Sequence, residues 1–228
     1  MQFQVEVAGV DSLLLRFMAP VDEGLLETIA CCTQALQSSL GDVLLDIVPS
    51  YSTILLTYNL LKISDSEIRQ QINAICQEAV TSSVERLSSK EVCLPVCYEH
   101  SHAPDMSALS EKLGLSVQQI IDLHSEDSYR VYAVGFTPGF AYLGELCKEL
   151  RVPRLATPRL KVPAGSVAIA ESNTAVYPQQ TPGGWWLIGR CPFLLFDKNS
   201  NPPVKLQTGD KVRFEPISTA RYEQLRQF

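Results

Sequence analysis

Residues 135–197 have the sequence GFTPGFAYLGELCKELRVPRLATPRLKVPAGSVAIAESNTAVYPQQTPGGWWLIGRCPFLLFD. Within them, residues 135–192 hold seven of the twelve glycines and seven of the fourteen prolines of the chain. Proline fixes φ and lacks an amide donor, whereas glycine permits positive φ, so breaks this frequent exclude long helices. Apolar and aromatic residues lie between the breaks. The stretch therefore predicts short strands joined by tight loops, as in a small β-barrel or sandwich.

Residues 1–89 have a different pattern, which predicts strand, strand, helix, strand, strand, helix. The expected strands are residues 3–7, 12–17, 43–48 and 51–58, and the first helix is residues 22–40. Ser64 and Glu67 form a capping box before the second helix, whose apolar face consists of Ile68, Ile72, Ile75 and Ala79. This order is typical of a compact α+β sandwich domain with helices on one face of an antiparallel sheet.

A short polar joint at residues 87–90 predicts the boundary between this domain, residues 1–89, and a second domain, residues 90–228. The second domain has predicted strands at residues 91–98 and 211–215, and residues 129–135 open the patterned stretch. Its predicted helices are residues 105–113, 116–124 and 218–226, where Ser116 with Gln119 forms a second capping box and Ser218 is a cap. The chain is therefore expected to be α+β as a whole.

Composition and charge exclude several functions. The formal net charge is −6 and the pI about 5.1, so no basic field draws the chain to nucleic acid or anionic lipid. The first residues lack the pattern of a secretory signal, and no apolar run reaches membrane-spanning length. Seven cysteines, an odd number, favour reduced thiols. We expect a cytoplasmic protein that binds neither nucleic acid nor membrane.

Four ordered motifs carry a family resemblance: GFTPGFAYLG at 135–144, PRLATPRLKVPAGSVAI at 153–169, YPQQTPGGW at 177–185 and IGRCPFLLFD at 188–197. Together they resemble the first subunit of the allophanate-hydrolase and carboxyltransferase-like family. That family includes a subunit of bacterial ATP-dependent 5-oxoprolinases and an inhibitor of a sporulation histidine kinase. The resemblance implies a cyclophilin-like β-barrel for the second domain.

The resemblance also implies a function. It indicates a non-autonomous subunit of an enzyme that couples ATP hydrolysis to opening 5-oxo-L-proline to L-glutamate, together with a second carboxyltransferase-like barrel subunit and a third, unrelated subunit. The chain has no phosphate-binding G-x4-G-K-[ST] or G-x-G-x-x-G loop, so we expect ATP to be used by the complex and the chain alone to have little activity.

Two alternatives remain open from the sequence. The chain could be a regulatory protein that inhibits a histidine kinase. It could also be a half-site of a biotin-dependent urea- or allophanate-type carboxyltransferase, with biotin supplied by a partner.

A basic segment is the strongest charge signal. Residues 148–161 contain five Lys or Arg and one Glu, which gives +4 in a chain of net −6. Prolines stiffen the backbone before both arginines of the segment's PRLATPR motif, which favours aimed guanidinium groups. The candidates for binding a carboxylate or phosphate are Arg154, Arg159, Lys161, Gly165 and Ser166. Solvated ion pairs are the alternative. If Arg159 binds an anion, its loss should reduce activity more than stability.

Two glycine-containing loops with aromatic residues predict the walls of a ligand pocket. The wall residues are Gly135, Phe136, Pro138, Gly139, Phe140, Tyr142, Pro182, Gly183, Gly184 and Trp185. The alternative is that these loops are barrel corners with core aromatics. Trp185 and Trp186 are adjacent, so in an extended strand their side chains point to opposite faces.

The remaining chemical candidates are weaker. His124 could act as an acid or base and Ser166 could take part in chemistry, although a helix-terminal histidine and a turn serine are simpler interpretations. Cys93, Cys97, His100 and His102 have a spacing that suggests zinc. In an extended strand the two cysteines would be roughly 13 Å apart, too far for one tetrahedral site. We therefore expect no metal.

Overall fold

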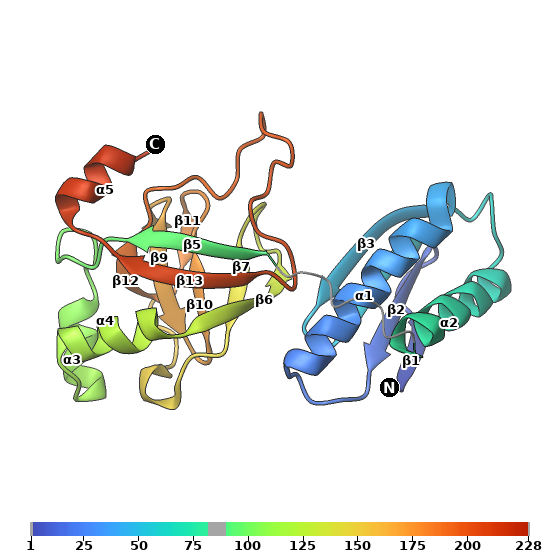
Figure 1. The fold of residues 1–228 in the computed structure, drawn as a ribbon, viewed down its shortest axis with the longest axis horizontal. Helices are drawn as coiled ribbons and strands as arrows, with labels where there is room; N and C mark the ends of the chain where they lie inside the picture. The colour runs from blue at the N-terminus through green and yellow to red at the C-terminus, as the bar shows by residue number, and fades with distance from the viewer. Residues whose placement is uncertain (1, 82–89, 228) are drawn as a thin grey trace. The chain divides into compact units, whose positions relative to one another are not determined.

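The computed structural model describes residues 2–81 and 90–227. The chain divides into two compact units, Met1–Ser89 and Lys90–Phe228, each with its own hydrophobic core (Figure 1). Apart from Lys90, the joint expected at residues 87–90 lies outside the described residues. No helix in the described part of the chain is long and apolar enough to span a membrane.

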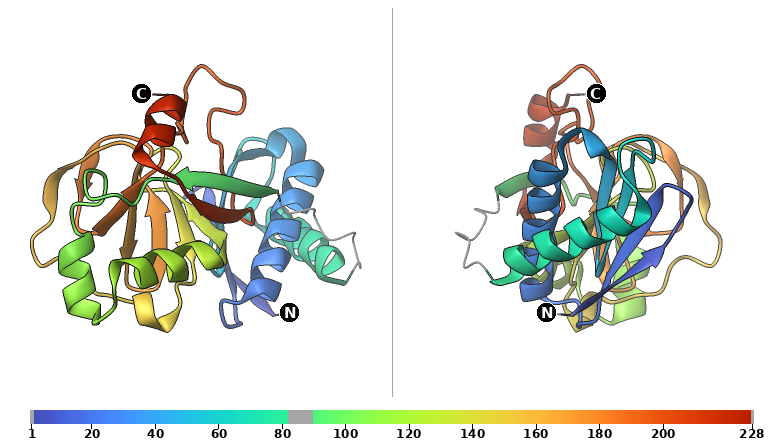
Figure 2. Two further views of the ribbon diagram at one scale, coloured as in Figure 1. Left: turned by 60° about the vertical axis from the view of Figure 1, so that its left-hand side comes forward. Right: turned by 90° about the vertical axis from the view of Figure 1, so that its right-hand side faces the viewer.

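The first unit contains an antiparallel sheet in the order β1-β2-β4-β3, with two helices on one face (Figures 1 and 2). The predicted order of strands and helices is confirmed, and so is the Ser64–Glu67 capping box, whose two backbone amides each bond the other residue's side chain. The elements are β1 (Phe3–Val7), β2 (Ser12–Phe17), α1 (Glu23–Leu40), a 3-10 turn η1 (Gly41–Val43), β3 (Leu44–Ser50), β4 (Thr53–Tyr58) and α2 (Asp65–Thr81).

Strict alternation along β2 and β4 creates the core of the first unit. Every second residue of each strand is buried beneath the helices, while the residues between them are more exposed. The buried set is Leu13, Leu15, Phe17, Ile54, Leu56 and Tyr58. The expected two-layer arrangement follows from this period-two pattern packed against two amphipathic helices.

The second unit holds the glycine- and proline-rich stretch. Its strands are β5 (Glu91–Val96), β6 (Ser128–Val134), β7 (Ala141–Gly144), β8 (Arg159–Val162), β9 (Ser166–Ala170), β10 (Asn173–Val176), β11 (Thr181–Gly183), β12 (Trp186–Arg190) and β13 (Lys211–Pro216). Its helices are α3 (Met106–Leu113), α4 (Val117–Glu126), α5 (Thr219–Leu225) and a 3-10 turn η2 (Lys148–Leu150). The predicted caps Ser116 with Gln119, and Ser218, are confirmed.

The strands of the second unit do not close into the expected cyclophilin-like barrel. They pair in the order β5-β13-β6-β7-β10-β9-β12, antiparallel except for β5 with β13. Among the described residues, one isolated bridge joins the two ends of this sheet, in which Cys97 and Arg190 exchange two 2.9 Å backbone hydrogen bonds. The mixed α and β class is confirmed, but one bridged residue pair is not a continuous ladder.

Strand β9 is buried at all five residues because both faces of the sheet are covered. Val167 and Ile169 belong to the main core, whereas Ala168 and Ala170 belong to a second cluster on the other face. That second cluster includes Val162 of β8, which pairs with β11 in a separate two-stranded ribbon. We call Phe140, Tyr142, Tyr177 and Trp185, the aromatic residues of this second cluster, the outer aromatic cluster.

Gly189 makes close approach of the two end strands possible. A Cβ at this position would lie 2.7 Å from Val96 Cγ1 and 3.0 Å from the carbonyl oxygen of Cys97.

Gly189→Ala should therefore destabilise the protein by about 1–3 kcal/mol through overpacking. Urea unfolding of the variant measures this. Gly135→Ala is the control, because a Cβ there meets no atom within 4 Å. Equal stability of both variants would contradict the close packing.

Candidate functional site

The basic segment is partly neutralised by nearby acids. Arg154 Nε lies 3.4 Å from Glu171 Oε1, and both side chains are more than half exposed. Arg151 Nη2 lies 2.8 Å from Glu145 Oε2. Lys161 is exposed on β8 and has no ion pair with the described residues. Exposed pairs contribute only about 0–1 kcal/mol, so Arg154 and Lys161 could turn to a ligand at little cost.

Arg159 has a protein partner that the sequence does not indicate. Its Nη2 donates to Asp105 Oδ1, and the side chains of Arg159 and Asp105 are 31% and 10% exposed. The other Asp105 oxygen accepts the Leu187 amide at 2.7 Å, and the Asp105 amide donates to the Leu187 carbonyl at 3.2 Å. One nearly buried carboxylate therefore connects the start of β8 to β12.

Asp105 occupies the N-cap position of α3, yet its side chain does not cap the helix. An aspartate cap normally contributes about 1 kcal/mol to helix stability. Here the carboxylate is used instead for Arg159 and the Leu187 amide. From the sequence, Asp105 was only the expected beginning of a helix. No local signal identifies its partners, which are 54 and 82 residues away.

The Asp105 carboxylate changes what Arg159 can bind. Arg159 Nη1 is buried and has no hydrogen-bond partner among the described residues, so its N–H donors are not used within this part of the chain. At an effective dielectric constant of about 20, an anion about 4 Å from the guanidinium is attracted by about 4 kcal/mol. The same anion would lie about 6 Å from the Asp105 carboxylate, which repels it by about 3 kcal/mol. The two effects nearly cancel, so Asp105 weakens the attraction of Arg159 for an anion, and the anion-binding role of Arg159 stays a prediction.

The two predicted wall loops do meet, around Phe140. The Phe140 ring contacts Phe136 at 5.4 Å, Tyr177 at 5.1 Å and Trp185 at 5.8 Å between centroids, in each case edge to face. Tyr142 contacts Phe140 at 4.9 Å and Trp185 at 6.0 Å. Phe140, Tyr177 and Trp185 are nearly buried, so they form a packed floor more than an open wall.

Phe136 is the exposed member of this aromatic group. The residue is 64% exposed, and its φ of 68° is unusual for a residue with a Cβ. Such strain of about 1–3 kcal/mol is found most often at functional sites. Pro138, Pro182, Gly183 and Gly184 complete the two loops without contributing polar side chains. Gly139, with φ 82°, is fitted closely against Leu195 and Phe196.

The two tyrosine hydroxyls of the cluster lie in the field of the arginines. Burial raises the pKa of Tyr177 to about 12, while the charges of Arg154 and Arg159 act in the opposite direction. Burial also raises the pKa of Tyr142, again opposed by Arg154. Gly183 is required beside Tyr177, since a Cβ there would collide with the tyrosine oxygen. Both hydroxyls therefore remain protonated donors near pH 7.

The expected anion-binding turn at Gly165 and Ser166 does not have free amides. Gly165 donates to the Tyr177 carbonyl at 2.7 Å, and Ser166 donates to the Pro163 carbonyl at 3.3 Å. Ser166 is 4% exposed at the beginning of β9. The hypothesis of an anion nest is therefore replaced by a tight turn, for which φ 80° at Gly165 suits glycine.

His124 lies in the core, which removes the support for an acid or base role. Its side chain is fully buried and stacks on Phe214 at 4.5 Å. Tyr98 Oη lies 2.7 Å from Nδ1, and Thr174 Oγ1 lies 2.8 Å from Nε2. Because the Thr174 hydroxyl donates to the Ala168 carbonyl, His124 Nε2–H donates to Thr174 and Nδ1 accepts from Tyr98. Both ring nitrogens are therefore used.

The cysteine and histidine cluster is dispersed. Cys93 is exposed and contacts Glu215, whereas Cys97 is buried with its sulfur 3.7 Å from His102 Nδ1. Within residues 2–81 and 90–227, no three His, Cys, Asp or Glu side chains are placed to hold a metal ion. The adjacent tryptophans separate as expected: Trp185 lies in the outer aromatic cluster, and Trp186 packs on the main core and donates to the Pro153 carbonyl at 2.8 Å.

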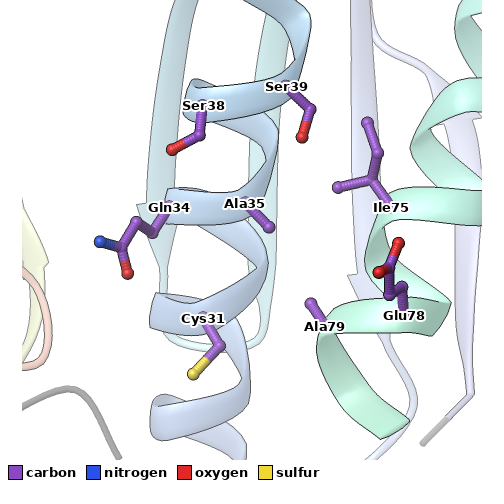
Figure 3. Close-up of a pocket in the computed structure, with 8 residues that line it drawn as sticks. All are labelled: Cys31, Gln34, Ala35, Ser38, Ser39, Ile75, Glu78 and Ala79. Atoms are coloured by element: carbon purple, nitrogen blue, oxygen red, sulfur yellow. The ribbon is translucent and has the colours of Figure 1, made fainter. Parts of the chain in front are cut away.

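The first unit has a hollow of about 290 Å³ between α1 and α2, and none of the predicted site residues lines it. Figure 3 shows Ala35 of α1 facing Ile75 and Ala79 of α2 across it, with polar groups at the edges. The remaining lining residues are Cys31, Gln34, Ser38, Ser39 and Glu78. They include no cation and no nucleophile paired with a base, so the hollow does not suggest chemistry.

Comparison with known proteins identifies relatives along most of the chain. Residues 3–206 match the family described as "Carboxyltransferase domain, subdomain C and D". The chain is 32% identical over 230 residues to a 5-oxoprolinase subunit of Bacillus subtilis (strain 168), an alignment that covers 97% of this chain and 95% of that protein. It is 48% identical over 128 residues to the corresponding 5-oxoprolinase subunit of Escherichia coli O157:H7, covering 56% of this chain and 59% of that protein.

Two solved structures share the fold. The protein TTHA0988 is 33% identical with a TM-score of 0.80, covering 91% of this chain and 40% of that one. The chain therefore spans less than half the length of that structural relative. The urea amidolyase of K. lactis is 16% identical with a TM-score of 0.73, covering 97% of this chain and 15% of that one. At this identity the likeness concerns the fold alone.

The Asp105–Arg159 contact predicts a stability effect that the sequence did not. Arg159→Ala leaves a nearly buried carboxylate without its cation and should destabilise the protein by about 2–3 kcal/mol, somewhat below a fully buried pair because Arg159 is partly exposed. Adding Asp105→Asn should recover more than half of the loss, since an amide oxygen still accepts the Leu187 N–H. Urea unfolding of both variants measures the coupling. A change below about 0.5 kcal/mol for Arg159→Ala would show that the pair is not structural.

His124 predicts acid sensitivity. Burial lowers its pKa from 6.5 to about 3, so the folded state keeps it neutral while the unfolded state binds a proton below pH 6.5. The contribution of His124 to the free energy of unfolding is fully present above pH 6.5 and is lost as the pH falls towards 3. From pH 7.5 to 5.5 the loss should be about 1.4 kcal/mol.

The measurement is urea unfolding at the two pH values, together with the imidazole nitrogen shifts by NMR. His124→Gln should lose this part of the pH dependence. If His124 titrates near pH 6.5 in the folded protein, the buried neutral assignment is wrong.

Proposed function

The chain belongs to the carboxyltransferase-domain family of subdomains C and D, and on this premise we propose that it is a non-autonomous subunit of an ATP-dependent 5-oxoprolinase. In this proposal the complete enzyme opens 5-oxo-L-proline to L-glutamate and couples the step to ATP hydrolysis. The observation that carries it is the alignment with the B. subtilis 5-oxoprolinase subunit, which covers nearly the whole of both chains.

The outer aromatic cluster and its arginines are the part of this chain that we assign to the substrate. The charge of Arg154 acts on both tyrosine hydroxyls of the cluster, and its ion-pair partner among the described residues is the exposed Glu171. A guanidinium of this kind suits the carboxylate of 5-oxoproline, through two parallel hydrogen bonds. Phe136 and Tyr142, the exposed and half-exposed rings, suit the apolar face of a small ring. Lys161, which lies on β8, is a second exposed cation of the basic segment.

The other components of the reaction are assigned to partners. We propose a second carboxyltransferase-like subunit and a third unrelated subunit, with ATP used by the complex and the whole assembly in the cytoplasm. Both curated relatives are named as subunits of 5-oxoprolinase, which supports a multi-subunit enzyme. The sequence of this chain has no nucleotide-binding loop, which supports an ATP site built with or by a partner.

The test is reconstitution. The chain should be purified alone and with co-expressed partner subunits, and 5-oxoproline-dependent ATP hydrolysis should be measured for each. We expect activity from the complex and little or none from the chain. A pure, correctly folded complex without 5-oxoproline-dependent turnover would overturn the proposal, and tight binding to a histidine kinase with inhibition would favour a regulatory protein instead.

Arg154→Ala tests the assignment of the carboxylate within this complex. Loss of a charge-assisted contact should lower kcat/KM roughly ten- to a hundredfold, while stability changes by no more than about 1 kcal/mol, because the Glu171 pair is exposed. Lys148→Ala is the matched control, since it removes an exposed charge of the same segment outside the outer aromatic cluster. Equal losses for both variants would indicate a general charge effect in place of a specific contact.

A further inference from the structure

Arg159 and Asp105 form a neutral pair with unused hydrogen-bond donors. Arg159 carries five N–H donors in a planar group. One nitrogen contacts Asp105, Nη1 is buried without a partner among the described residues, and 31% of the side chain is exposed. The opposing carboxylate is nearly buried and also fixed by Leu187, so it cannot move away from the guanidinium. The pair therefore offers donors without offering net charge.

The ribbon of β8 and β11 contains another buried donor without a partner. Thr181 Oγ1 on β11 is buried and unbonded among the described residues, and Thr181 is paired with Val162 on β8. Buried polar groups are almost always hydrogen-bonded, so two such atoms on one short ribbon call for an explanation. Both can donate, and a neutral carbonyl oxygen accepts from either without adding charge beside Asp105.

From this geometry we infer that Asp105 is a positioning residue, which holds Arg159 to donate to the neutral carbonyl oxygen of an amide or lactam and to disfavour an anion there. This inference rests on the proposed function for its choice of a lactam. It divides the work between two arginines: Arg154, with an exposed partner, takes the charged end of the ligand, and Arg159, with a fixed partner, takes the uncharged end.

Asp105 stands at the N-cap position of α3 without capping the helix, and this supports a specific role for its carboxylate beside Arg159. A carboxylate at an N-cap normally binds the helix amides, and this one does not. Departures from a local rule of this kind concentrate where another requirement dominates. An asparagine at position 105 would still accept the Leu187 amide but would leave Arg159 with its full charge, so the two roles of Asp105 can be separated by Asp105→Asn.

The experiment uses the isolated chain and two small probes, neutral 2-pyrrolidinone and acetate. The Nε–H resonance of Arg159 is followed by NMR and assigned by its disappearance in Arg159→Lys. In the wild-type chain, 2-pyrrolidinone should shift this resonance, and acetate should bind the group at least about tenfold more weakly. Asp105→Asn should raise the affinity for acetate at least about tenfold, because the repelling carboxylate charge is gone. Glu111→Gln, an exposed acid on α3, should change neither.

Three results would overturn the inference. These are acetate binding as tightly as the lactam in the wild-type chain, unchanged selectivity in a folded Asp105→Asn, and no response of Arg159 to either probe. If Asp105→Asn does not fold, the wild-type comparison of the two probes still decides. The outcome is separate from the proposed function: an active complex whose Arg159 ignores the lactam contradicts only this inference, and an inactive complex whose Arg159 binds it contradicts only the enzymatic role.

Discussion

The complete burial of β9 is the constraint on which the second unit depends. A strand buried on both faces needs two layers of cover, and alternate residues of β9 pack into two different clusters. Small alanines on the outer face leave room for large rings, so Phe140, Tyr177 and Trp185 can pack there at native density. The β8–β11 ribbon then covers these rings, and this places the basic segment beside the aromatic residues.

Two buried polar groups of this arrangement, the Asp105 carboxylate and the His124 imidazole, are paired. Asp105 connects the beginning of β8 to β12 through Arg159 and the Leu187 backbone, so it fastens the ribbon to the sheet. His124 is satisfied at both nitrogens, by Tyr98 in the loop after β5 and by Thr174 of β10. Burying a polar group without partners costs several kcal/mol, so these contacts select one arrangement of the elements. Arg159 Nη1 and Thr181 Oγ1 are buried without a hydrogen-bond partner among the described residues, and atoms of this kind are where a ligand is worth seeking.

The candidate site was predictable in its location but not in its chemistry. Glycines and prolines in residues 135–192 indicated shaped loops, and the structure does bring Phe140, Tyr142 and Trp185 together. The charges were harder to interpret. A count of +4 over residues 148–161 does not show that Arg159 faces an acid from another part of the chain. Free amides at Gly165 were also expected, because a glycine turn looks the same in sequence whether or not its donors are taken.

The sequence by itself determined the strands and helices of the first unit, the capping residues Ser64, Ser116 and Ser218, and the family of the chain. Caps, turns and periodic burial depend on residues a few positions apart, so they are visible in a linear pattern. The partner of Arg159, the burial of His124 and the open edge between β5 and β12 were decided only by the tertiary structure. Each depends on groups 26 or more residues apart, and neither the burial nor the charge of a distant neighbour is encoded in the residues beside it.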